Sequence, residues 1–62
     1  MRTFTIIFKL KGKLTAYEFL PIDKAIKVMN FLTRNGFNPV CQTSANGITE
    51  QLTLKELEVL ND

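Results

Sequence analysis

Few side chains in this 62-residue sequence could do chemistry. It contains no histidine and one cysteine, Cys41, which is the only side chain that could serve as a nucleophile. General acid–base catalysis near neutral pH would need a strongly shifted carboxylate, lysine or cysteine, and such shifts require a deep pocket that so short a chain can hardly enclose. The remaining possible metal ligands are scattered carboxylates. The sequence therefore predicts no enzyme, no catalytic residue, no metal site and no cofactor.

Cys41 is better explained as part of a core. A turn at Asn46-Gly47, the strongest hairpin dipeptide in the chain, would place Cys41 opposite Leu52 on the inner face of a hairpin. A free cysteine in such a position behaves as a small hydrophobic residue. A single cysteine also cannot form an intramolecular disulfide, so the chain has no covalent staple.

A second group of candidates combines an aromatic side chain with cations. Phe31 lies on a predicted helix, between Lys24 and Lys27 in angle and one turn from Arg34 in sequence. An aromatic among cations on a helix face can anchor a protein contact or stack on nucleic-acid bases. The alternative is that Phe31 folds over the edge of a sheet as peripheral core. We take these four residues as the candidate partner-binding site.

Three further cations, Lys9, Lys11 and Lys13, straddle a predicted turn. They could contact phosphates at a hairpin tip, although a solvated turn whose lysines discourage edge-to-edge pairing is the simpler interpretation. The formal charge of +2 is unevenly distributed. Residues 1–36 carry seven cations and two carboxylates, whereas residues 37–62 carry one cation and four carboxylates. Such asymmetry favours an acidic partner at one end, or stacking of the chain on itself.

The first element is a hairpin over residues 2–20. Residues 2–11 alternate polar and apolar, which is the pattern of a half-buried strand. A two-residue turn at Lys11-Gly12 would pair Phe4 with Phe19 and Ile6 with Tyr17, and so gather the aromatic side chains on the inner face.

The outer face of this hairpin is more apolar than a solvated face should be, because it would present Ile7, Leu14, Ala16 and Leu20. Either the C-terminal helix or a second copy of the chain must cover it. A domain of this size has a small core that a partner often supplements. We therefore predict a homodimer at micromolar concentration, with Ile7, Leu14 or Leu20 buried by self-association.

The middle of the sequence predicts a helix from an N-cap at Asp23 to about Asn35. Asn35 and Gly36 supply the stop, and a contact between Phe37 and Leu32 would complete a Schellman motif. The inner stripe of the helix is expected to consist of Ile22, Ala25, Ile26, Met29 and Leu32.

Two strands and a short helix follow. Residues 37–43 read as a strand in which Pro39 suggests a sheet edge, and residues 48–52 return as a fourth strand. A capping box at Thr53–Glu56 begins a C-terminal helix whose inner line is Leu54, Leu57 and Leu60.

Together these elements predict one α+β domain over residues 1–62, in the order ββαββα. A four-stranded, mainly antiparallel sheet carries the first helix across one face, and the C-terminal helix lies at an edge or on the back. The expected core comprises Phe4, Ile6, Phe8, Phe19, Ile26, Met29 and Leu32.

The function is reached by exclusion. No apolar leader follows Met1-Arg2-Thr3 and no stretch approaches the length of a membrane span, so we expect a soluble, cytoplasmic protein without membrane contact. The leading hypothesis is a non-catalytic protein-binding module: a small adaptor, inhibitor or regulator, of the kind found in phages and other mobile elements, with a protein partner of unknown identity. The alternative is a nucleic-acid-binding module, which requires the basic residues of the N-terminal half to converge on one face.

Overall fold

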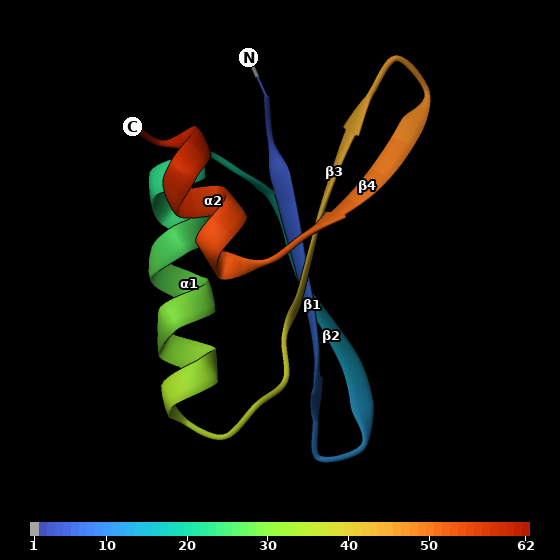
Figure 1. Ribbon diagram of the computed structural model, residues 1–62. Helices are drawn as coiled ribbons and strands as arrows, with labels where there is room; N and C mark the ends of the chain where they lie inside the picture. The colour runs from blue at the N-terminus through green and yellow to red at the C-terminus, as the bar shows by residue number, and fades with distance from the viewer. Residues whose placement is uncertain (1) are drawn as a thin grey trace.

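The computed structural model describes residues 2–62 and confirms the predicted α+β fold (Figure 1). Its elements follow the order ββαββα. They are β1 (Phe4–Leu10), β2 (Lys13–Leu20), α1 (Ile22–Arg34), β3 (Val40–Ala45), β4 (Ile48–Leu52) and α2 (Leu54–Leu60). No helix within residues 2–62 is long and apolar enough to cross a membrane.

The four strands form one sheet in the order β2-β1-β3-β4, with every neighbouring pair antiparallel. β3 therefore lies inside the sheet, and the prediction that Pro39 marks an edge is wrong. The strand begins at Val40 rather than Phe37. Because Pro39 precedes the ladder, its missing N–H leaves no strand hydrogen bond unmade.

The β1–β2 hairpin confirms the predicted turn and corrects its far end. Ile6 pairs with Tyr17 as expected, but Phe4 pairs with Leu20 instead of Phe19. Between these pairs β1 has only Thr5, whereas β2 has two residues, so a β-bulge interrupts the ladder. The extra residue exchanges the faces of Phe19 and Leu20. Leu20 packs against the core, and Phe19 is 74% exposed.

Helix α1 begins two residues earlier than predicted and ends as predicted. It starts at Ile22 with Pro21 as N-cap and no side-chain capping bond, so Asp23 is not the cap but an acidic residue of the first turn. At the other end, Phe37 N–H donates to the carbonyl of Leu32 at 3.0 Å. Together with the positive φ of Gly36, this bond forms the expected Schellman motif.

The core lies between the sheet and the helices. Five of the seven predicted core residues are buried there, Ile26 is partly buried, and Phe19 is excluded by the bulge. The buried hydrophobic residues are Phe4, Ile6, Phe8, Ala25, Met29, Leu32, Cys41, Leu52 and Leu57. The ring of Phe8 contacts both β2 and the loop after α1. Its centroid lies 5.7 Å from that of Tyr17, on which it stacks, and 5.4 Å from that of Phe37, which it meets edge-on.

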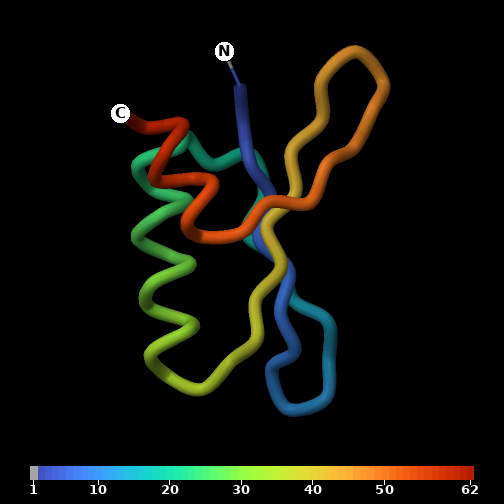
Figure 2. The backbone as a smooth tube through the Cα atoms, in the orientation of Figure 1, coloured from blue at the N-terminus to red at the C-terminus, as the bar shows by residue number. Residues whose placement is uncertain are grey.

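Helix α2 lies beside α1 on the same side of the sheet (Figures 1 and 2). The Thr53 hydroxyl accepts from Glu56 N–H, and the Glu56 carboxylate accepts from Thr53 N–H, so the predicted capping box is present. Leu57 is buried in the common core, while Leu60 remains 47% exposed. The alternative in which α2 covers the back of the sheet is thus wrong. Among residues 2–62, nothing covers that face.

Candidate protein-binding surfaces

The outward side of α1 carries Lys24, Lys27, Phe31 and Arg34, which we call the basic stripe. Their spacing of three, four and three residues aligns them along the helix axis. All four side chains are exposed, and the exposed fraction of Phe31 is 61%. On the opposite side of the helix, Ala25, Met29 and Leu32 are buried. Phe31 therefore faces solvent and does not fold over the sheet edge. The helix period predicted that these four residues align on one side of α1, and the structure adds that Phe31 is exposed there.

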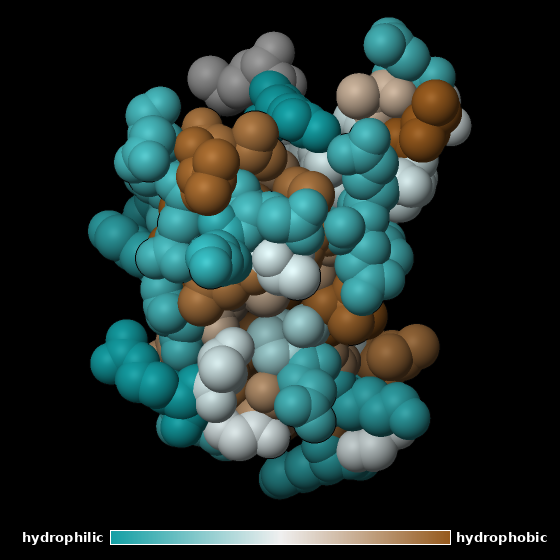
Figure 3. All heavy atoms as spheres, in the orientation of Figure 1, coloured by the Kyte–Doolittle hydropathy of each residue, from teal (hydrophilic) through white to brown (hydrophobic). Residues whose placement is uncertain are grey.

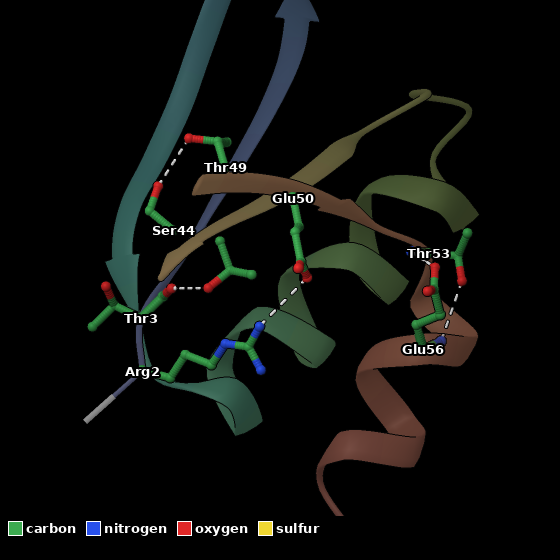
Figure 4. Close-up of polar contacts among 8 residues, drawn as sticks. Arg2, Thr3, Ser44, Thr49, Glu50, Thr53 and Glu56 are labelled. Carbon is green, nitrogen blue, oxygen red and sulfur yellow. Dashed lines mark hydrogen bonds and ion pairs between the residues drawn. The ribbon is translucent and has the colours of Figure 1, made fainter. Parts of the chain in front are cut away.

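The cations of the basic stripe have no ionic partner within the described part of the chain. The one ion pair among residues 2–62 joins Arg2 to Glu50, with the nitrogen 3.7 Å from the carboxylate oxygen (Figure 4). The three positive side chains are therefore available to carboxylates of another molecule. Asn35 closes the helix behind them, because its side-chain amide donates to the Phe31 carbonyl at 2.7 Å.

The second surface is the uncovered side of the sheet, which we call the outer face. Its most exposed side chains are Leu14, at 73%, and Phe19, at 74%. Ile7 and Val40 are half-buried beside Leu14, whereas the neighbours of Phe19 are polar, among them Thr5 and Gln42. Ile7 and Leu14 lie here as predicted. Leu20 does not, because the bulge turns it inward and puts Phe19 in its place.

Sequence reasoning missed Phe19 because alternation alone cannot locate a bulge. Two consecutive β2 residues, Glu18 and Phe19, lie opposite Thr5, so Leu20 at the end of the strand changes face. The only signal lay in the pattern itself, since Phe19-Leu20 offers two adjacent apolar residues for one inward position.

The lysines of the first turn do not join the basic stripe. Lys9 pairs with Leu14 on the outer face, whereas Lys13 pairs with Leu10, whose side chain has the inward parity. Lys11 occupies the turn itself with a φ of 51°. The outer face and the outward side of α1 lie on opposite sides of the two layers (Figures 1 and 2). The six cations of the two clusters therefore do not converge on one face.

Cys41 lies opposite Leu52 as predicted and is fully buried. Burial raises the pKa of its thiol, which further disfavours the nucleophilic thiolate. Residues 2–62 contain no cluster of three or more side chains suited to hold a metal ion. The polar contacts that remain nearby are structural: Thr43 donates to the Thr3 carbonyl at 2.9 Å, and the hydroxyls of Ser44 and Thr49 lie 3.1 Å apart (Figure 4).

A shallow apolar groove runs between β4 and α2. Leu52, Val59 and Leu60 line it, and the Arg2–Glu50 ion pair borders it. Figure 3 shows apolar side chains gathered over α2 within a largely hydrophilic surface. The groove has no unpaired buried polar group that would select a ligand, because every buried side-chain polar atom in the described chain has a hydrogen-bond partner.

Comparison of the chain with protein-family models, with curated proteins and with solved structures found no match.

Proposed function

We propose that this protein is a non-catalytic protein-binding module that engages an acidic protein surface through the basic stripe of α1. The observation that carries the proposal is the exposed Phe31 ring, aligned on one side of a helix with three cations that form no ion pair within residues 2–62. Aromatic residues and arginine are the side chains that most often dominate protein interfaces. The cytosol is the compartment that suits such a module, since its single cysteine is free.

The partner's chemistry follows from the stripe. Three cations spaced over three turns of helix favour a row of carboxylates, and Phe31 between them favours an apolar recess at the centre of that row. The partner's surface is therefore acidic at the rim and apolar in the middle. Helix α1 presents the stripe rigidly because its other side is packed into the core and its end is held by the Schellman motif.

The test compares immobilised wild-type protein with Phe31→Ala in capture from a lysate of the native host, followed by calorimetry on the retained protein. Phe31→Ala should weaken that complex by more than about 1 kcal/mol, whereas replacing any one lysine should cost far less. Thr33→Ala is the matched control, because Thr33 is an exposed residue of α1 outside the stripe. A partner retained equally by all three proteins would contradict the proposal.

Nucleic-acid binding is the competing outcome. It would appear as tight binding to single- or double-stranded nucleic acid at about 150 mM salt, with an affinity that falls steeply as salt rises. Replacing Lys24, Lys27 and Arg34 together by glutamate would abolish it. The separation of the two basic clusters weighs against this function, because one polyanion could not contact all six cations from a single side.

A further inference from the structure

The outer face of the sheet presents an unusual residue at its bulge. Phe19 has a φ of 58°, in the left-handed region, where a bulky side chain is rare. This conformation is strained for a residue with a Cβ atom, whereas glycine adopts it readily. The bulge itself is explained by Leu20, which it turns into the core. A phenylalanine at position 19 is not explained within one chain, because its ring is 74% exposed.

We propose that a second copy of this chain covers the outer face, and that Phe19 is the anchor of the resulting two-fold dimer. This inference is independent of the proposed function, because the outer face and the basic stripe lie on opposite sides of the molecule. In the dimer the Phe19 ring would gain the burial that the monomer denies it. Residues that keep a strained backbone conformation are often found at functional sites, such as ligand-binding sites.

Two exposed sheet faces can pack against each other as the sheets of a sandwich do, about 10 Å apart.

The charges of the outer face suit a copy of itself. Among the strand residues with outward parity, Lys9 and Glu18 are the only charged ones, and they lie near opposite ends of the β1–β2 ladder. A two-fold axis across the strands near the Ile7–Ala16 pair would bring Lys9 of each copy close to Glu18 of the other. The basic stripe would by contrast meet like charges in a symmetric pair. Self-recognition is therefore assigned to the outer face.

Sedimentation equilibrium of the full chain tests the assembly. Between about 1 and 100 µM, the range in which a modest standard-size interface associates, we expect a mass approaching twice the monomer mass of 7.1 kDa. A chain that stays monomeric throughout would overturn the dimer. That result would leave the basic stripe untouched, because binding to α1 is measured with a different molecule and a different variant.

Phe19→Gly locates the interface without the risk of unfolding. Glycine keeps the left-handed conformation and removes the ring, so the dimer dissociation constant should rise by about tenfold or more. The melting temperature at concentrations where both proteins are monomeric should not fall. Phe31→Ala, on the opposite side, is the matched control and should dimerise like the wild type. A dimer that survives Phe19→Gly unchanged, or that is lost in Phe31→Ala, would overturn the assignment.

Charge exchange tests the symmetry. Lys9→Glu or Glu18→Lys alone places like charges at both symmetric contacts and should weaken the dimer. The double variant Lys9→Glu/Glu18→Lys restores opposite charges and should recover much of the lost affinity. Effects of the two single variants that merely add, with no recovery, would refute the proposed axis.

Discussion

The outer face of the sheet and the basic stripe of α1 are the two broad exposed surfaces of this small domain, and they differ in almost every physical respect. The outer face combines apolar and uncharged polar side chains from all four strands with one cation and one carboxylate. The basic stripe comes from one helix and combines a single ring with three like charges. A surface with no net charge can bind a second copy of itself without repulsion. A surface whose charges are all positive is suited instead to an acidic partner.

The comparison also shows how one strand serves two purposes. Residues of β1 alternate between the core and the outer face, so neighbours in the sequence have different roles. Phe8 is buried between Tyr17 and Phe37, whereas Ile7, one residue away, lies beside Leu14 and Val40. Stability and the proposed self-recognition therefore depend on adjacent side chains of the same strand.

The largest expected effect separates these roles within β1. Phe8→Ala removes a buried ring with two aromatic contacts and should cost about 3–5 kcal/mol, enough to unfold most of a domain this small. Ile7→Thr keeps the branched shape, and we expect a much smaller loss in the monomer together with a weaker dimer. Urea unfolding followed by circular dichroism measures both variants. Equal destabilisation by the two would erase the distinction between the faces.

A smaller effect distinguishes the forces at the two surfaces. Raising the salt concentration from about 50 to 500 mM shortens the screening length from roughly 14 to 4 Å and weakens exposed charge pairs. Binding of an acidic partner to the basic stripe should fall severalfold over this range, because three cations contribute to it. The dimer constant should change by less than about threefold, since apolar burial dominates the outer face. Calorimetry measures the salt dependence of partner binding, and sedimentation at the same salt concentrations measures that of the dimer. A dimer that is more sensitive to salt than partner binding would contradict the comparison.

The smallest effect concerns Cys41, which lies beneath both surfaces. Burial raises the pKa of its thiol, so the folded state holds this proton more tightly than the unfolded chain does. Its contribution to stability is complete below the unfolded pKa and is lost as the pH rises through the folded value. The free energy of unfolding should therefore decline in the alkaline range, and part of that decline should disappear in Cys41→Ala. An identical alkaline slope in both proteins would show that other groups cause it.

The sequence-based predictions were most accurate where the interactions involve residues that are close in the chain. The turn at Lys11-Gly12, the Schellman stop after α1 and the capping box of α2 were all correct, because each depends on a few consecutive residues. The predicted N-cap of α1 at Asp23 was wrong, because the helix begins at Ile22 after Pro21 and no side chain caps it. Exposure of Phe31 was left open by the pattern and decided by the packing of α1, which turns Ala25 and Met29 inward.

Local sequence patterns were enough to predict the six elements, the inner stripe of α1 and the position of Cys41 opposite Leu52, because helix period, strand alternation and turn chemistry involve residues that are close in the chain. Three features could be seen only in the folded chain: the order of the strands, the side of the sheet on which α2 packs, and the bulge that turns Leu20 inward and Phe19 outward. Each of these depends on competition among distant apolar residues for one small core. Leu57 is buried in that core, and Leu20 packs against it. Phe19 was left on the surface, where we propose that a second chain covers it.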